Sequence, residues 1–497
     1  MPGLMRAALA AAGLLLLSGS AAVQTLYVDP AGGQDAPGHG SAALPLKTIA
    51  YAVTRYAGKP VTLELRLQPG SYDTTSGEVF PIALPARATL RAVVPGTVEI
   101  RKSAMQFTTV FSAVDAERLQ LEGVLVGSPD RGLQCTNNPG TGLVLDLIGV
   151  RMANSRDLAV NLQAARADVT LTGCELRGGD SGVILSAQQG SVANLSLERC
   201  VVANVWHGVN ANASGAGSTI FSLIRGCLFD APGVNGVLSQ TSLGAQSASW
   251  IEGCVFHRCG TATIPPSGQA LHDVWDSQSA APLHSVVNST FFQNGRDMPE
   301  YSAATYLLQH NLVQDPGLVG VGGSLSGDPL FVDAPRGNFR LTLGSPGRDR
   351  GANTHVTQAV DFDGAPRIDP PQLGGAGVVD IGAYEYYPCH VSACPVPVKP
   401  GVVVRYRLVG PPGALALLGL GSGIDPHAPF GDRLRLLGLS PPIWLGVVGL
   451  DHSLTWSFGV PSAPSLVGLT CHWQAGFVHA SGVTFSYNVL AQTVVRA

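Results

Sequence analysis

A six-residue pattern recurs along the middle of the chain, and its regular spacing restricts the possible folds more than any other feature. The copies are LEGVLV (121–126), LIGVRM (147–152), LTGCEL (171–176), LERCVV (197–202), IRGCLF (224–229), IEGCVF (251–256) and VNSTFF (287–292). Their fourth residues, from Val124 to Thr290, are separated by 26, 24, 26, 27, 27 and 36 positions. A nearly constant period of this length indicates a stacked array of repeats.

Each repeat contains three short segments with the pattern of β-strands. Within the six-residue pattern the apolar residues alternate, which predicts a strand with one buried face. A glycine precedes the fourth residue in five of the copies and permits a sharp corner. A second apolar run lies just upstream, and a small residue followed by an aliphatic one lies downstream, as in Gly182-Val183. Three short strands per coil predict an all-β fold, a parallel β-helix whose equivalent residues stack about 4.8 Å apart.

The fourth position is a cysteine in four consecutive repeats, at Cys174, Cys200, Cys227 and Cys254. Cysteine is small and readily buried, so the stacking predicts a structural ladder of free thiols inside the coil. A metal site is not expected there, because no column of histidines or carboxylates accompanies the thiols.

The composition and the N-terminus suggest an exported chain. Only 13% of the 497 residues are charged, the formal net charge is −4, and no basic stripe is present, which argues against nucleic acid as a partner. Arg6, the apolar run 7–17 and the small residues 20–22 predict a signal peptide over residues 1–22, cleaved after Ala22. No second apolar run is long enough to form a transmembrane segment. We expect a secreted protein, extracellular or at the cell surface.

The remaining chain divides by composition into several parts. Residues 23–58 are expected to form an N-terminal cap with a helix over 45–57, residues 59–326 the β-helix, and residues 327–388 a closing coil and C-terminal cap segment. Residues 389–397 form a linker, and the short apolar runs of 398–497, separated by Gly and Pro, predict a small β-sandwich. In an oxidising compartment, Cys389 and Cys394 are close enough in sequence to form a disulfide.

Three stretches add resemblances to known families. YVDP, PLKTIAYAV, PGSY, GEVFPIALP and ATLRA, in this order, resemble secreted right-handed parallel β-helix proteins with the pectin-lyase-like fold, a bacterial family of undefined function, over roughly residues 26–345. GDPLFVDAPRGNFRLTLGSPGRDRGAN, DFDGAPR and VVDIGAYEYY (327–387) are similar to the closing segment of surface β-helix proteins of the choice-of-anchor Q type. PSAPSLVGLTCHWQAGFV resembles the C-terminal sandwich of secreted proteins from planctomycete-like bacteria. The resemblances imply a right-handed coil but no defined activity.

Polar residues converge at one predicted corner of the coil. Asp180, His207 and Asn235 each lie just before the small-aliphatic step of successive repeats, and Asp230 is nearby. An insertion around 261–285 adds His272, Asp273, Trp275, Asp276 and His284, and Trp206 lies beside His207. These residues predict a glycan-binding or catalytic groove with Trp206 and Trp275 as ligand-binding side chains. The alternative is that Asp, Asn and His before glycine are turn formers.

A second acidic group, Asp361, Asp363, Asp380 and Glu385, offers oxygen ligands for Ca²⁺ or, alternatively, ends turns. Beside the Cys column no two outward carboxylates lie on neighbouring coils, although glycoside hydrolysis needs a pair roughly 5–10 Å apart. We therefore expect a protein that binds polysaccharide or cell-surface glycan, adheres or scaffolds. The alternative is a polysaccharide lyase or glycoside hydrolase that acts along the corner.

Overall fold

The computed structural model describes residues 22–102, 109–127, 131–153, 158–261, 268–298, 301–302, 305–364, 366–368 and 377–386 of the N-terminal part. Beyond these it describes residues 390–394, 403–409, 414–421, 423–424, 436–437, 443–447, 453–460, 469–479, 482–485 and 490–493. The predicted signal peptide, except Ala22, and Cys389 of the predicted disulfide lie outside the described residues.

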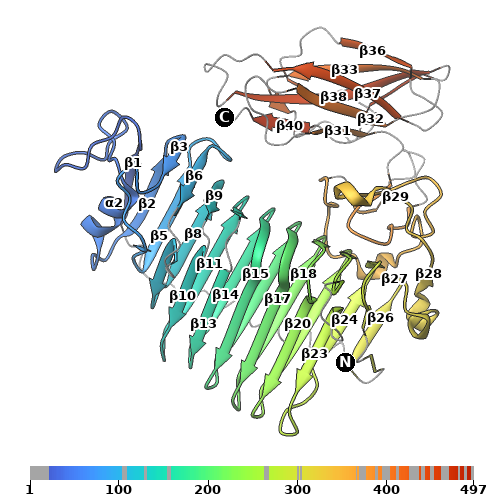
Figure 1. Ribbon diagram of the computed structural model, residues 1–497, viewed down its shortest axis with the longest axis horizontal. Helices are drawn as coiled ribbons and strands as arrows, with labels where there is room; N and C mark the ends of the chain where they lie inside the picture. Colours follow the sequence, from blue (N-terminus) through green and yellow to red (C-terminus); the bar gives the residue numbers. More distant parts are fainter. Residues whose placement is uncertain are drawn as a thin grey trace.

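The repeats form a parallel β-solenoid, which confirms the predicted all-β fold and the right-handed parallel β-helix (Figure 1). One strand of each coil belongs to an 11-stranded sheet, the first sheet. Its members are β1 (Val23–Val28), β2 (Thr62–Leu67), β5 (Arg87–Ala92), β8 (Arg118–Glu122), β11 (Gly142–Ile148), β14 (Arg166–Thr172), β16 (Val192–Glu198), β18 (Thr219–Arg225), β21 (Gln246–Glu252), β24 (Leu283–Val287) and β26 (Tyr306–Gln309).

The other two strands of each coil belong to a 17-stranded second sheet. Its first row comprises β3 (Gly70–Tyr72), β6 (Val98–Arg101), β9 (Val124–Gly127), β12 (Arg151–Ala153), β19 (Leu228–Asp230), β22 (Val255–His257), β25 (Thr290–Phe292), β27 (Leu312–Val313) and β28 (Leu325–Ser326). Its second row comprises β4 (Ile82–Ala83), β7 (Phe111–Val114), β10 (Leu133–Asn137), β13 (Leu158–Gln163), β20 (Asn235–Ser242) and β23 (Gln269–Trp275). β15 (Glu175–Gln188) and β17 (Val201–Ser214) run through both rows.

The uninterrupted strands β15 and β17 correct the predicted corner. Each is 14 residues long and passes from the first row to the second without a break. Asp180 and His207 therefore lie within strands rather than in turns. Left-handed residues occur earlier in these strands, at Gly178 (φ 71°) in β15 and Asn204 (φ 54°) in β17. At Gly182 and Gly208, an added Cβ would meet the backbone oxygen of the next coil at 2.7 Å and 2.3 Å. Glycine is needed there because successive coils approach too closely for a side chain.

The core of the solenoid is filled by like residues in single file. Cys174, Cys200, Cys227 and Cys254 are at most 1% exposed, and the ladder of backbone pairs places them one above another. The N–H of Cys200 donates to Sγ of Cys227 (3.5 Å), and the N–H of Cys227 donates to Sγ of Cys254 (3.4 Å). Burial raises the pKa of the Cys227 thiol, which keeps it protonated.

The register of the last repeat differs from the prediction by one residue. Thr290 pairs with Val255, so Ser289 rather than Thr290 follows Cys254 in the file, and Ser289 Oγ accepts from the N–H of Cys254 at 3.1 Å. Asn311 then continues the file, because its Oδ1 accepts from the N–H of Ser289 at 2.9 Å. The predicted register was wrong because the left-handed corner position of this repeat is Asn288 (φ 49°), whereas in the preceding repeat it is Gly253 (φ 57°). No glycine marks the corner in the last repeat.

The N-terminal end of the solenoid is closed by helix α2 (Ile49–Tyr56). The helix begins four residues later than predicted, because Thr48 is its N-cap and Thr48 Oγ1 accepts from the N–H of Tyr51. The buried carboxylate of Glu78 accepts from the N–H groups of Ile49 (2.5 Å) and Ala50 (3.0 Å), which have no partner within the helix.

The described residues of 327–386, here called the closing segment, do not form the predicted further coil. They form the antiparallel hairpin β29 (Phe331–Asp333) and β30 (Asn338–Leu341) with short 3-10 turns, and pack on the outer face of the first row. Leu228 and Val255 of that row form a buried cluster with Phe339, Ala383 and Tyr384 of the closing segment. In the last coils, the outer face of the first row is thus covered.

The C-terminal strands are antiparallel, unlike those of the solenoid (Figure 1). One sheet contains β31 (His390–Cys394), β32 (Val403–Val409) and β37 (Ser453–Gly459), and another contains β33 (Leu415–Gly421), β36 (Ile443–Val447), β38 (Thr470–His479), β39 (Gly482–Phe485) and β40 (Leu490–Thr493). A short pair, β34 (Gly423–Ile424) and β35 (Leu436–Leu437), accompanies them. Tyr406 and Trp473 belong to a core shared by the two larger sheets, as in a sandwich. No described helix is long and apolar enough to cross a membrane.

Candidate functional site

Four successive coils bring polar residues into one column at the bend of the second sheet. Backbone pairing places Ser181, His207, Asn235 and Gln269 opposite one another in β15, β17, β20 and β23. Asp180 precedes Ser181, so it lies one residue outside the predicted register. We call these residues, together with Asp180 and His272, the corner row.

Hydrogen bonds connect neighbouring members of the corner row. Nδ2 of Asn235 lies 3.3 Å from Nδ1 of His207, and Oε1 of Gln269 lies 2.7 Å from Nδ1 of His272. An amide nitrogen can only donate, so Nδ1 of His207 accepts and the ring proton resides on Nε2. The buried amides of Asn235 and Gln269 therefore fix the orientations of the half-buried imidazoles of His207 and His272.

The charge of the corner row is low. Burial lowers the pKa of the half-buried His207, and the nearby His272 adds to this effect, whereas Asp180 opposes it. His207 is therefore neutral at neutral pH and can both donate and accept hydrogen bonds. Asp180 is exposed and supplies the one carboxylate among the named members of the row.

Of the two exposed tryptophans predicted for the groove, Trp206 lies beside the corner row, whereas Trp275 lies at the far end of a second-row strand. Trp206 is 40% exposed and lies over the backbone of Gly233, where an added Cβ would be 3.2 Å from the indole. Trp275 is 45% exposed and lies six residues beyond Gln269 in β23, which corresponds to about 20 Å along a strand. The two predicted aromatic side chains therefore do not form one patch.

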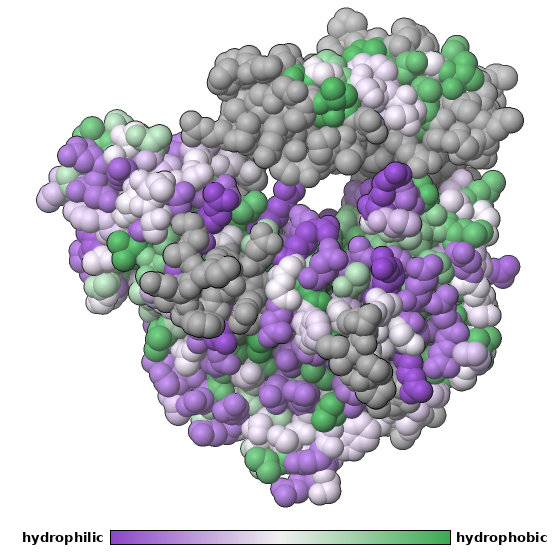
Figure 2. All heavy atoms as spheres, in the orientation of Figure 1, coloured by the Kyte–Doolittle hydropathy of each residue, from purple (hydrophilic) through white to green (hydrophobic). Residues whose placement is uncertain are grey.

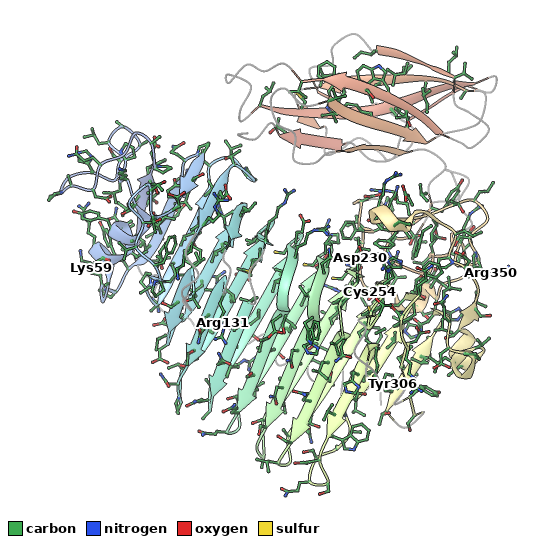
Figure 3. All side chains as sticks on the ribbon, viewed as in Figure 1. Lys59, Arg131, Asp230, Cys254, Tyr306 and Arg350 are labelled. Carbon is green, nitrogen blue, oxygen red and sulfur yellow. The ribbon has the colours of Figure 1, made fainter. Side chains whose placement is uncertain are left out.

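Three carboxylates predicted for the groove are elsewhere. Asp273 faces the interior of the solenoid, is 5% exposed, and accepts from Nε2 of His284 and the hydroxyl of Tyr306, both at 2.7 Å. Asp276 caps a turn, and its hydrogen bonds to the N–H groups of Leu243 and Gln278 lower its pKa. Asp230 lies beneath the closing segment (Figure 3), 2.8 Å from Nδ1 of the buried His257, whose ring packs against Phe339.

The interior also contains a chain of polar groups that the sequence did not reveal. Ser249 Oγ bonds to Nδ1 of His284, which continues through Nε2 to Asp273 and then to Tyr306. All four side chains are at most 5% exposed. The signal was present in the strand alternation, since Ser249, His284 and Tyr306 occupy the same column of the first sheet. Because the group is enclosed, we interpret it as a satisfied polar cluster of the core.

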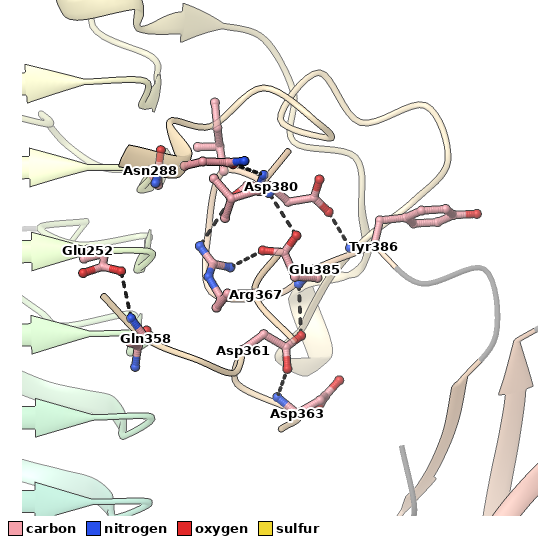
Figure 4. Close-up of polar contacts among 12 residues, drawn as sticks. Glu252, Asn288, Gln358, Asp361, Asp363, Arg367, Asp380, Glu385 and Tyr386 are labelled. Atoms are coloured by element: carbon pink, nitrogen blue, oxygen red, sulfur yellow. Dashed lines mark hydrogen bonds and ion pairs between the residues drawn. The ribbon is translucent and has the colours of Figure 1, made fainter. Parts of the chain in front are cut away.

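The acidic residues of the closing segment are held by their own segment (Figure 4). Asp361 accepts from the N–H groups of Asp363 and Glu385, and Asp380 accepts from those of Asp349 and Tyr386. Asp363 forms a two-point ion pair with Arg340, with both contacts at 2.6 Å. Glu385 pairs with the buried Arg367 at 2.7 Å. Within the described parts of the chain, no group of three or more His, Cys, Asp or Glu side chains could hold a metal ion.

A cavity of about 930 Å³ lies between the last coil and the closing segment, with Ser326, Arg348 and Arg350 among its lining residues. It shares no residue with the corner row. Arg348 is already occupied by Asp349 (3.2 Å) and the ring of Tyr386. Within the corner row, Ser181, Asn235 and Gln269 are at most 5% exposed, so the row reaches the surface through Asp180, His207 and His272.

Comparisons with known proteins agree with the fold without assigning an activity. A family described as a protein of unknown function (DUF1565) matches residues 31–95. No curated protein sequence matches the chain.

Two solved structures match this chain at low similarity. Full-length tailspike protein 2 from Escherichia coli O157:H7 bacteriophage CAB120 is 10% identical, with a TM-score of 0.30, over 95% of this chain and 68% of that protein. The mannuronan C-5 epimerase AlgE6 A-module of Azotobacter vinelandii is 13% identical, with a TM-score of 0.19, over 56% of this chain and 93% of that module. At these values neither likeness supports an argument about activity. The chain is a right-handed parallel β-helix protein of undefined function.

Proposed function

We propose that this is a secreted or cell-surface β-helix protein that binds a polysaccharide or cell-surface glycan along the corner row. The observation that supports the proposal is the pair of half-buried imidazoles, His207 and His272, each hydrogen-bonded to a buried amide, with the exposed indole of Trp206 beside His207. Planar polar groups match the hydroxyls of a sugar, and an aromatic face packs against its apolar C–H face.

Binding is favoured over hydrolysis by where the carboxylates lie. Of the four predicted for the groove, Asp230 is beneath the closing segment, Asp273 is inside the coil and Asp276 caps a turn. Asp180 is left without a second predicted carboxylate at the spacing that a glycosidase uses. The half-buried imidazole groups of the row are suited to recognition.

The test is a glycan array with the mature protein, with and without Ca²⁺, followed by affinity measurements on the best ligand. We expect Trp206→Ala and His207→Ala each to weaken binding about tenfold, equivalent to about 1.4 kcal/mol. Leu307→Ala is the matched control, since Leu307 is 47% exposed on the first sheet. Equal affinity of the wild type, the two variants and the control would remove the corner row as the binding site.

A further inference from the structure

The outer face of the second row carries a regular ladder of uncharged polar side chains. Backbone pairing places Thr136, Asn161, Ser186, Asn212 and Gln240 opposite one another on β10, β13, β15, β17 and β20. A parallel file beside it contains Gln163, Gln188, Ser214 and Ser242. We call the first file the amide ladder. Its members are half-buried, so their polar ends reach solvent.

The absence of charge among these nine side chains contrasts with the outer face of the first sheet. There, neighbouring strands carry ion pairs such as Arg91–Glu122 (2.8 Å) and Arg225–Glu198 (3.2 Å). In Figure 2 the visible surface of the solenoid is mostly hydrophilic to intermediate, with small hydrophobic groups scattered over it. Neither the solubility of the solenoid nor the stacking of its coils requires uncharged side chains on the outer face, because the first sheet stacks in the same way and carries ion pairs.

Amides and hydroxyls both donate and accept hydrogen bonds, so they match ligand hydroxyls without removing a charge from water. An anionic ligand would instead require Arg or Lys side chains, which form the strong pairs with carboxylates. The chemistry of the amide ladder therefore fits an uncharged, hydroxyl-rich ligand.

The spacing of the ladder indicates that the ligand is itself a repeating chain. Each member comes from the next coil, so the file runs along the solenoid axis in steps of about 4.8 Å. Similar chemistry is offered at five successive steps. A small molecule would use one or two of them, whereas a linear polymer lying along the axis meets every step.

The end of the ladder is apolar. Val274 of β23 pairs with Gln240 and is 42% exposed, and the adjacent Trp275 is 45% exposed. An exposed indole at the end of an amide file suits a ligand with both hydroxyl edges and apolar faces, which is a property of sugar rings.

We propose that the amide ladder, ending at Val274 and Trp275, binds a linear, uncharged polysaccharide whose chain runs parallel to the solenoid axis. The inference rests on the proposed glycan-binding function: it adds a second contact surface, further along the same strands as the corner row, and specifies the class and direction of the ligand.

The experiment measures the affinity of the full chain for uncharged linear glucans, mannans and xylans and for polyuronates of similar length. We expect the best uncharged glycan to bind at least tenfold more tightly than any polyuronate, with less than a twofold change between low and high salt, because counterions screen only charged contacts. Asn212→Ala combined with Gln240→Ala is expected to weaken binding about tenfold. Asn194→Ala, on the outer face of the first sheet and bonded to Asp168, is the control and leaves binding unchanged.

The outcomes separate the two proposals. Tighter, salt-sensitive binding of polyuronates overturns the inference while the proposed glycan-binding function stands. Binding that Trp206→Ala weakens but the Asn212 and Gln240 variant leaves intact also overturns only the inference. No binding to any glycan, with all variants folded by thermal unfolding, overturns both.

Discussion

At the scale of single residues, the interior of the coil is governed by a strict fit between neighbouring coils. Cys254 receives the N–H of Cys227 on its Sγ, and its own thiol donates to the carbonyl of Glu252 at 3.4 Å. One coil further on, Ser289 makes the equivalent contacts, since its Oγ accepts from Cys254 and donates to the carbonyl of Val287 at 3.0 Å. From Cys174 to Ser289 the position thus holds a small side chain with one donor and one acceptor, whereas valine fills it at Val124 and Val150.

We therefore expect Cys254→Ser to cost less than about 1 kcal/mol of unfolding free energy, because the hydroxyl satisfies both neighbours. Cys254→Leu, in contrast, should cost about 1–3 kcal/mol, because extra methylenes overpack a completely buried site. Urea unfolding of both variants checks the difference. A serine variant as unstable as the leucine variant would contradict the assigned hydrogen bonds.

The alternation of apolar residues made the four cysteines predictable from the sequence, but it could not place Asp273. In β23 the side chains that face the interior are Leu271 and Asp273. A sequence identifies the inward face of a strand only where that face carries apolar residues. Asp273 is tolerated inside because His284 and Tyr306 satisfy it. A polar residue on the inner face is read from sequence as an outer one unless its partners are known.

At the scale of the elements, the turn before the second sheet has one backbone requirement in eight of the described coils. The residue in front of the stacked file has a left-handed φ of 49–68° at Gly123, Gly149, Gly173, Arg199, Gly226, Gly253, Asn288 and His310. The sequence identified this corner wherever glycine marks it. The register predicted at Asn288 was wrong, and the coil that contains His310 was not predicted. At both positions a residue other than glycine adopts the left-handed conformation, so the sequence gives no sign of the corner.

The left-handed conformation predicts opposite changes in the unfolding free energy for two substitutions at this turn. Gly149→Ala should destabilise the fold by about 1–2 kcal/mol, since an added Cβ meets no atom within 4 Å and the cost is purely conformational. Arg199→Gly should relieve the same strain at φ of 51° and stabilise by up to about 1 kcal/mol. Shifts of the thermal midpoint in opposite directions check the pair, and shifts of the same sign would contradict it.

At the scale of the whole molecule, a buried carboxylate lies in the structure that closes each end of the solenoid. Glu78 in the N-terminal cap is 3% exposed, and Asp380 in the closing segment is 2% exposed. Burial raises the pKa of each to about 7, although backbone hydrogen bonds partly oppose the effect. Both folded-state pKa values thus exceed those of the unfolded chain, about 4 to 4.5.

A raised carboxyl pKa means that ionisation opposes folding. The contribution of these two groups to stability is therefore complete below about pH 4 and declines as the pH rises to about 7. We expect the double variant Glu78→Gln and Asp380→Asn to lose less stability than the wild type between pH 4 and pH 7. The measurement is the slope of the unfolding free energy against pH, and identical slopes would contradict the assignment.

The solenoid itself could be predicted from period and alternation, whereas the position of the closing segment could not. Its attachment depends on contacts between residues about a hundred positions apart, such as the N–H of Thr357 donating to Glu252 at 2.7 Å. No local pattern specifies such a pairing. For the same reason, the sequence could not show that Asp230 would be covered.

The single file of thiols implies that the length of this protein can change independently of its ends. Cys200, Cys227 and Cys254 follow one another at intervals of 27 residues, and the hydrogen bonds of each thiol stay within its own and the adjacent coils. Duplication of one such interval would place a new turn between two existing turns and leave both terminal structures intact. A gene lineage could thereby lengthen or shorten the solenoid by whole turns without changing the structures at its two ends.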